Sequence, residues 1–310
     1  MTALDTRPSD AKGSASMGAD KLRSVPLEEL RRRFMVERAA LPRGWLSALR
    51  EDPRAGARAL GEQLAKAGHA AQAEGRRLSR LLAYERAVWA TGVQFIAGVD
   101  EAGMAPLAGP VVAAAVILPL EARLPGVDDS KQLLPEEREA LAPKIRALAI
   151  AWAIGRAEVE EIDSLNIYHA GLLAMHRAVT GLRVPPQHLL VDARKVPGVS
   201  MPQQGIIKGD AKSLSIAAAS ILAKTHRDAL LAELDAEYPG YGFVRHKGYP
   251  TPEHFAALDR LGACAVHRRS FAPVRRALGL EPKQEELFAN AARSDALAEA
   301  EASRRERRAR

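Results

Sequence analysis

Residues 94–118, QFIAGVDEAGMAPLAGPVVAAAVIL, contain two apolar segments of strand length with a turn rich in glycine and proline between them. The first segment ends in two adjacent acids, Asp100 and Glu101, and the second is rich in valine and alanine. Short apolar runs bounded by turn residues are typical of strands buried within a sheet. This segment therefore predicts two buried strands, with two carboxylates at the end of the first.

Strand and helix patterns alternate in the sequence that follows this pair. They predict strands at 148–158, 188–192 and 204–208 and helices at 159–182 and 213–236. Three strands followed by alternating helices and strands indicate an α/β domain with a mixed central sheet flanked by helices. We place this domain at residues 93–273.

The flanking segments have a different character. Residues 25–92 contain short helical patterns broken at proline and glycine positions, including Gly68, and predict a small basic helical module. Residues 1–24 lack hydrophobic periodicity and are expected to be disordered. Residues 274–310 are rich in Ala, Arg and Glu and are expected to form a frayed helix or a disordered tail.

The composition is ordinary for a globular protein, with 47% apolar and 27% charged residues. No segment approaches the roughly 20 consecutive apolar residues that a membrane-spanning helix needs. The N-terminus also lacks the basic-then-apolar order of a secretory signal. Cys264 is the only cysteine, which excludes an intrachain disulfide and a zinc site made of cysteines. We therefore expect a cytoplasmic protein without membrane association.

The net charge of +7 suggests a polyanionic partner. Residues 1–92 carry 17 Lys and Arg against 11 Asp and Glu, whereas residues 93–271 carry 19 against 20. The basic excess therefore lies mainly outside the α/β domain. If this near-neutral domain binds nucleic acid, its cations have to gather around its acids.

Two further acids follow strand-like segments, Asp192 after HLLV and Asp210 after GIIKG. Because strands of such a sheet end at a common edge, we expect these acids to converge with Asp100 and Glu101. Divalent cations relieve the repulsion among close carboxylates, and an all-oxygen ligand set favours Mg²⁺ or Mn²⁺. Two such ions, roughly 3.5–4 Å apart, support phosphodiester hydrolysis. Taken alone, Asp100 and Glu101 are equally compatible with a solvated surface turn.

Several segments resemble the motifs of ribonuclease HII. They are GVDEAG at 98–103, PLAGPVVAAAVIL at 106–118, DSK at 129–131, LVD at 190–192, KGDAKSLSIAAASILAKTHRD at 208–228, YPGYGFVRHKGYPTPEH at 238–254 and HRRSF at 267–271. The resemblance implies a ribonuclease H-like fold and a two-metal-ion endonuclease with Mg²⁺ or Mn²⁺. Such an enzyme cuts RNA in RNA–DNA hybrids and leaves 5′-phosphate and 3′-hydroxyl ends. The catalytic, metal-binding acids of the family fall on Asp100, Glu101, Asp192 and Asp210.

The same resemblance implies residues that contact the substrate. Tyr249 corresponds to the family tyrosine that stacks on the sugar at an RNA–DNA junction. From the residues alone, a tyrosine that covers the edge of the core is the simpler interpretation. Ser220 and Lys224 lie four residues apart on one helix face, where a hydroxyl and an ammonium would hold a phosphate. Further candidates for phosphate contact are Lys131, Lys208, Lys212, His246 and Lys247.

One segment departs from the family pattern. Where the family reads Gly-Arg-Gly, this chain has Gly103, Met104 and Ala105. In the family this segment senses the ribose 2′-hydroxyl, the group that distinguishes RNA from DNA. Ala105 adds a Cβ and disfavours positive φ, and Met104 lacks the guanidinium. We therefore expect nuclease activity with weakened or relaxed recognition of single ribonucleotides embedded in DNA.

Two alternatives remain beside this interpretation. The first is a catalytically weak or inactive nucleic-acid-binding protein of the same fold, although all four acids are retained. The second is a nuclease of this fold with another substrate, which Met104 and Ala105 leave open. The expected partner is an RNA–DNA hybrid or junction duplex, and nothing in the sequence requires more than a monomer. The basic extension is expected to add affinity for phosphates or to contact a protein partner.

Overall fold

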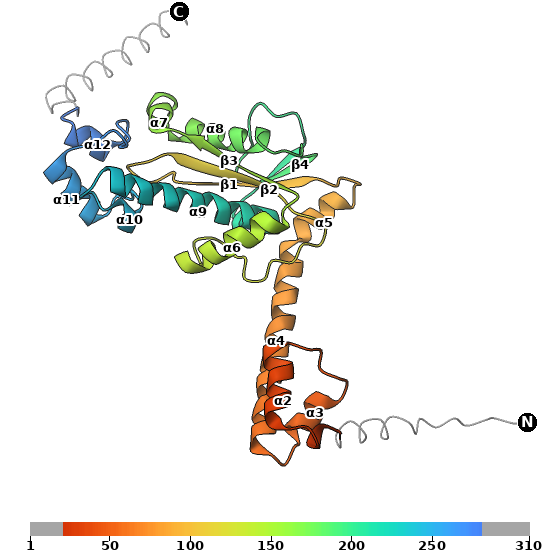
Figure 1. Ribbon diagram of the computed structural model, residues 1–310. Coiled ribbons are helices and arrows are strands. Elements are labelled where there is room, and N and C mark those ends of the chain that lie inside the picture. The colour runs from red at the N-terminus through yellow and green to blue at the C-terminus, as the bar shows by residue number, and fades with distance from the viewer. Residues whose placement is uncertain (1–20, 281–310) are drawn as a thin grey trace, which may run out of the picture. The chain divides into compact units, whose positions relative to one another are not determined.

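The computed structural model describes residues 21–280 (Figure 1). The chain divides into two compact units, an N-terminal unit that ends at Ser79 and a C-terminal unit that begins at Arg80. The expectations for residues 1–20 and 281–310, including the terminal SRRERRAR, lie outside the described residues.

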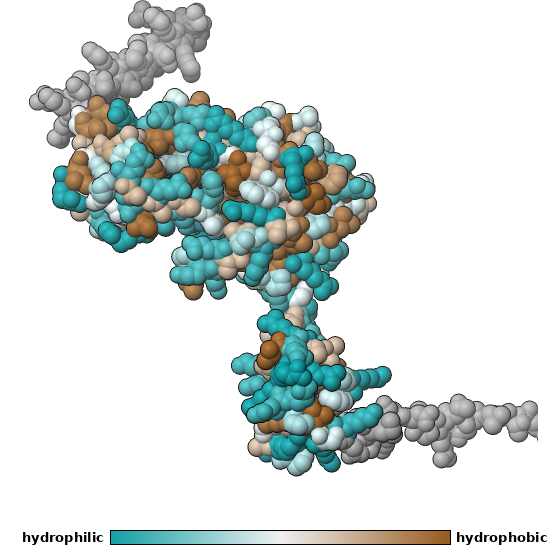
Figure 2. Space-filling view, viewed as in Figure 1, coloured by the Kyte–Doolittle hydropathy of each residue, from teal (hydrophilic) through white to brown (hydrophobic). Residues whose placement is uncertain are grey.

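The N-terminal unit is helical. Its elements are α2 (Leu27–Arg31), the π-helix η1 (Arg32–Val36), α3 (Trp45–Arg50) and α4 (Ala55–Leu81), which extends two residues past the unit boundary. The helices enclose a small core, in which the Phe34 and Trp45 rings meet edge to face at 5.8 Å. Its surface is mainly hydrophilic (Figure 2).

Two expectations for this unit are corrected. The predicted break at Gly68 is wrong, because α4 is continuous and Gly68 is exposed on it. One exposed glycine costs a helix about 1 kcal/mol, which a long helix tolerates. The predicted disorder up to residue 24 is also wrong for its last residues, because Leu22 is buried in the core and its carbonyl accepts a hydrogen bond from Arg54.

The C-terminal unit is built on a mixed five-stranded sheet in the order β3-β2-β1-β4-β5. The strands are β1 (Ile96–Ala102), β2 (Val111–Ile117), β3 (Ala151–Ala157), β4 (His188–Asp192) and β5 (Gln203–Ile206). β1 is antiparallel to β2 and parallel to β4. The predicted strands and the mixed sheet are confirmed.

Helices cover both faces of this sheet (Figure 1). The helices of this unit are α5 (Ala83–Trp89), α6 (Pro135–Leu148), α7 (Val159–Leu165), α8 (Ile167–Thr180), α9 (Leu214–Glu237), α10 (Phe243–His246), α11 (Pro252–Leu261) and α12 (Ala272–Ala277). α8 packs on one face and α9 on the other. Both approach very closely at glycines: a Cβ on Gly155 would lie 2.1 Å from the Ala174 carbonyl oxygen on α8, and one on Gly98 would lie 2.0 Å from the Ser215 carbonyl carbon on α9.

Several details differ from the sequence-based expectations. The helix predicted at 159–182 is interrupted at Asn166, which has a φ of 70° and caps α8 by accepting hydrogen bonds from the backbone of Tyr168 and His169. The tail predicted from residue 274 begins later, because Val274 in α12 is fully buried. Within residues 21–280, no helix is both long and apolar enough to cross a bilayer.

Candidate active site

The sheet brings Asp100 and Asp192 to the same edge. β1 and β4 are parallel, and Val99 is paired with Val191, so the residues that follow this pair lie side by side. Asp210 lies in the short 3-10 helix η2 (Gly209–Ala211). This turn is attached to the sheet edge, because the Gly209 amide donates a 2.7 Å hydrogen bond to Asp192 Oδ1.

Adjacent strand residues point to opposite faces of a sheet, and this separates Asp100 from Glu101. Asp100 shares the α9 face with Gly98 and is 4% exposed, and the nearby Ser220 hydroxyl partly opposes the rise in its pKa. Glu101 points to the other face, where its Oε1 lies 3.3 Å from Nη2 of Arg194. Its Oε2 is buried without a hydrogen-bond partner among the described residues.

The acids perturb one another strongly. Burial raises the pKa of Asp100 well above its ordinary value, and the negative charges of Glu101 and Asp192 raise it further. Burial also raises the pKa of Glu101, which the Arg194 cation partly opposes. The pKa of Asp192 is raised by burial and by the charge of Asp210. Buried carboxylates whose pKa values are raised together in this way are candidates for a functional site.

Two cations contact this group of carboxylates. Lys131 Nζ lies 3.1 Å from Asp210 Oδ2, and Arg194 pairs with Glu101. Within residues 21–280, no three His, Cys, Asp or Glu side chains are arranged as a ready-made metal site. The donors nevertheless suit a hard divalent cation, because all are carboxylates and the buried Oε2 of Glu101 has no partner in that same range. A bound cation would also relieve the repulsion that raises the pKa of Asp100.

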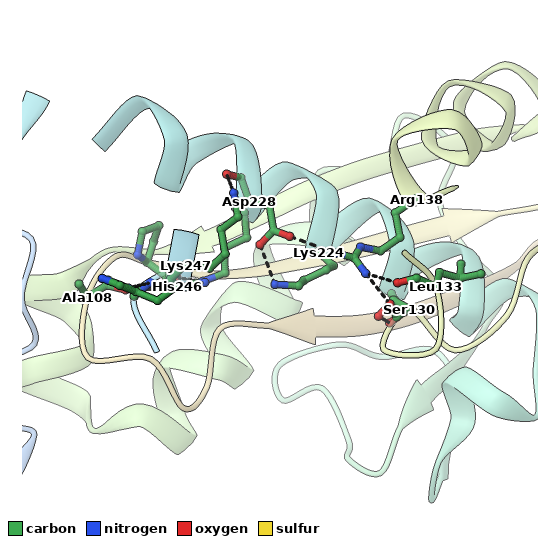
Figure 3. Close-up of polar contacts among 12 residues, drawn as sticks. Ala108, Ser130, Leu133, Arg138, Lys224, Asp228, His246 and Lys247 are labelled. Carbon is green, nitrogen blue, oxygen red and sulfur yellow. Dashed lines mark hydrogen bonds and ion pairs between the residues drawn. The ribbon is translucent and has the colours of Figure 1, made fainter. Parts of the chain in front are cut away.

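Tyr249 lies between α10 and α11 and is 38% exposed. Nζ of Lys224 lies 5.6 Å from the centre of its ring and 2.6 Å from Oδ1 of Asp228. Arg138 approaches the other oxygen of Asp228 at 3.4 Å and donates to the carbonyl of Ser130 (Figure 3). The tyrosine therefore stands beside a lysine whose position is fixed by a carboxylate.

Other candidates are placed differently from the sequence-based expectation. Ser220 is 4% exposed and faces Asp100 and the hydroxyl of Ser130, so it does not form a phosphate site with Lys224. His246 is buried, and its two ring nitrogens bond to the Tyr241 carbonyl and the Gly248 amide. The expectation that His246 contacts phosphate is therefore corrected: it supports the turn that precedes Tyr249.

The candidate lysines differ in their surroundings. Lys208 is exposed and lies two residues before Asp210, with a φ of 56°. Lys212 donates to the carbonyl of Ile207, and Nζ of Lys247 lies 3.5 Å from the carbonyl oxygen of Asp228.

The segment that departs from the family is firmly held. Gly103 has a φ of 98°, and a Cβ there would lie 2.2 Å from Nε of Arg227. Met104 is partly buried and packs against the core between β1 and α8, whereas Ala105 is exposed. Within 103–105, positive φ occurs at Gly103 alone. The backbone conflict expected at Ala105 therefore does not arise.

Three arginines near the site were not predicted from the sequence. Arg227 donates to the carbonyls of Ala108, Pro110 and Lys247, and Arg268 donates to those of Gly103, Met104 and Gly109. Burial lowers the pKa of Arg227 to about 10 and that of Arg268 to about 9. Both hold the loops that carry Gly103 and Tyr249. Arg227 and Arg268 lie in THRD and HRRS, which belong to the segments that resemble the family. No sequence pattern distinguished Arg194.

Comparisons with known proteins extend over both units. Residues 97–274 match the family model described as Ribonuclease HII, and residues 28–89 match the one described as Ribonuclease HII N-terminal domain. Ribonuclease HII of Anaeromyxobacter sp. (strain Fw109-5) is 62% identical over 273 residues, covering 88% of this chain and 87% of that protein. Ribonuclease HII of Myxococcus xanthus is 61% identical over 262 residues, covering 84% and 89%.

Two solved structures are also similar. Ribonuclease H2 of Pyrococcus horikoshii OT3 has a TM-score of 0.52 at 28% identity, covering 59% of this chain and 96% of that one. A chain of the PCNA:RNase HII complex of Archaeoglobus fulgidus has a TM-score of 0.50 at 25% identity, covering 62% and 99%.

Proposed function

This chain belongs to the ribonuclease HII family and is a ribonuclease H with a ribonuclease H-like fold, and from that membership we propose that it is an endonuclease for the RNA strand of RNA–DNA hybrids. Cleavage leaves 5′-phosphate and 3′-hydroxyl ends. The observation that carries this proposal is the convergence of Asp100, Glu101, Asp192 and Asp210 at one edge of the sheet.

The four carboxylates hold two Mg²⁺ or Mn²⁺ ions in this proposal. When bound, such ions supply the Lewis acidity that activates a water and stabilises the leaving oxygen. The hydroxyl of Ser220 orients Asp100, and the Gly209 amide orients Asp192. Lys131 and Arg194 balance the negative charge of Asp210 and Glu101 before a cation enters.

Substrate contact is assigned to groups around this edge. The exposed ring of Tyr249 offers a stacking surface for a nucleotide, with Lys224 beside it. The exposed Lys208 and Lys131 contact phosphates near the carboxylates. Arg268 presents the backbone of Gly103 and Met104 in a fixed conformation. Lys247, two residues before Tyr249, is a further phosphate contact in this proposal. We propose that the protein acts as a monomer and that it is cytoplasmic. A molar mass near 33.4 kDa by light scattering would support the monomer.

The test compares three duplexes of one sequence: an RNA–DNA hybrid, double-stranded RNA and double-stranded DNA. Each is incubated with the protein in Mg²⁺, in Mn²⁺ and in chelator. We expect cleavage of the hybrid's RNA strand alone, dependent on the cation, with 5′-phosphate ends. Binding without cleavage under every condition would support the inactive binding protein instead, and cleavage of DNA would support a different nuclease.

Junction recognition is a separate proposal that concerns Met104 and Ala105. The Cβ of the exposed Ala105 obstructs close approach of a sugar to the backbone, and the side chain of Met104 is engaged with the core. We therefore propose weak incision at a lone ribonucleotide relative to a continuous hybrid. The double substitution Met104→Arg with Ala105→Gly should raise that ratio. Efficient incision 5′ of a lone ribonucleotide by the unsubstituted protein would refute this proposal.

A further inference from the structure

Glu85 on α5 is a buried carboxylate outside the active site. It is 2% exposed, and its Oε1 accepts three hydrogen bonds from the start of α9. The donors are the Ser213 hydroxyl at 2.6 Å, the Ser215 amide at 2.9 Å and the Ser215 hydroxyl at 2.7 Å. Since a buried carboxylate needs strong donors, this cluster determines where the first turn of α9 lies.

α5 is itself fixed to the sheet. Val88 and Trp89 on this helix pack with Ile96 of β1 and Ile216 of α9. The helix that carries Glu85 is therefore held by the apolar cluster that joins β1 to the start of α9.

The turn that Glu85 holds sets the position of α9 along β1. The backbone of Ser215 contacts β1 at Gly98 so closely that no Cβ fits between them. Two residues of a strand and five residues of a helix each advance by about 7 Å. The contact at Gly98 therefore places Ser220 beside Asp100, as observed.

The same turn also fixes Asp210. The Ser213 amide donates to the carbonyl of Gly209 at 2.8 Å, which closes η2 against the N-terminus of α9. Asp210 lies inside this closed turn, and the amide of Gly209 binds Asp192. A shift of Ser213 would therefore move Asp210 relative to the other carboxylates.

We propose that Glu85 is a positioning residue for the catalytic carboxylates, which acts by fixing the register of α9 on β1. It does not touch the reacting atoms. This inference rests on the proposed function for its kinetic readout, but its effect on cation binding can be measured without any substrate.

The experiment uses the full chain with Glu85→Leu, which keeps the volume and removes the acceptor, and Glu85→Gln, which keeps an acceptor oxygen for the same donors. Glu121→Gln is the matched control, because it weakens an exposed ion pair with Arg86 on the same helix as Glu85. Binding of Mn²⁺ alone is measured by calorimetry. The affinity for the hybrid is measured in chelator, and the single-turnover cleavage rate is measured in Mn²⁺. Circular dichroism verifies folding.

We expect Glu85→Leu to weaken Mn²⁺ binding and slow cleavage by about 10–100-fold, with hybrid affinity within about twofold of the parent. Glu85→Gln should recover most of both losses, and Glu121→Gln should match the parent. If folded Glu85→Leu binds Mn²⁺ as tightly as the parent, the proposal is overturned. An equal loss of Mn²⁺ binding and hybrid affinity also overturns it, because general destabilisation of the protein would weaken both.

If Glu85→Leu does not fold, Ser215→Ala decides the question by removing one donor to Glu85. An unchanged Mn²⁺ affinity in that variant overturns the proposal, and a weaker one supports it. If the parent chain binds Mn²⁺ but cleaves no hybrid, the proposed function fails while the test of Glu85 by Mn²⁺ binding still stands.

Discussion

Asp100 occupies a costly position. It is 4% exposed and close to two other acids, and its pKa is raised by burial and by their charges. The folded chain therefore binds a proton there more tightly than the unfolded chain does. The stability from this group is fully present below the ordinary aspartate pKa and is lost as the pH rises through the raised pKa. Above that raised pKa the ionised carboxylate costs stability, as is common for active sites.

Arg194 allows this electrostatic balance to be tested. Its cation opposes the rise in the pKa of Glu101, so Arg194→Met should raise that pKa further. Because a carboxylate must lose its proton to bind a cation, the pH midpoint of Mn²⁺ binding should move upward. Calorimetric titrations with Mn²⁺ across a pH series measure this midpoint. Arg183→Met, at an exposed arginine that donates to the Ile150 carbonyl, serves as the control. A midpoint that stays constant or falls would contradict the assignment.

At this scale the sequence predicted residue identity better than residue orientation. The convergence of Asp100, Asp192 and Asp210 follows from strand ends, which sequence patterns reveal. The burial of His246 depends on how the turn after α10 directs its ring, and neither spacing nor composition carries that information. Arg194 was missed for the same reason, since its role arises from the partner across the sheet edge.

Among the elements, α9 joins most parts of the site. Its N-terminus was predicted almost to the residue, and in the structure Ser213 caps it, because its hydroxyl accepts from the Ile216 amide. α6 was missed, and it contains Pro143, which weakens a helical pattern. α5 was predicted as a helix of the basic module, yet it belongs to the C-terminal unit through Glu85. Sequence periodicity shows where a helix lies but not which core it joins.

The role of α5 predicts a difference between two shortened chains. A chain that begins at residue 80 retains α5, and its turnover on a hybrid at saturating substrate should stay within about threefold of the full chain. A chain that begins at residue 91 lacks Glu85 and the apolar contacts of α5. Its turnover should fall by about 10–100-fold relative to the full chain. Circular dichroism verifies that both are folded. Equal turnover by the two would contradict the assignment of α5 to the C-terminal unit.

For the whole molecule, charge is distributed unevenly between a near-neutral centre and basic flanks. If the N-terminal unit binds phosphates, the chain that begins at residue 80 should show a weaker salt dependence of hybrid binding. The slope of log K against log salt is negative, and its magnitude should decrease by about 0.9 for each phosphate that the shortened chain no longer neutralises. Binding titrations at several salt concentrations measure this slope. An unchanged slope would assign the N-terminal unit to a protein partner instead.

The converging carboxylates are proposed to be the cleavage centre for RNA in a hybrid, and the proposed roles in substrate contact depend on this one. The decisive measurement is the single-turnover rate of Asp100→Asn on a labelled RNA–DNA hybrid in Mg²⁺ and in Mn²⁺, with hybrid affinity and metal-free stability measured on the same preparation. We predict no detectable cleavage, affinity within about twofold of the parent, and a stability gain of roughly 0.5–2 kcal/mol at neutral pH. Cleavage at the parental rate, with the same 5′-phosphate ends, would contradict the assignment of these carboxylates.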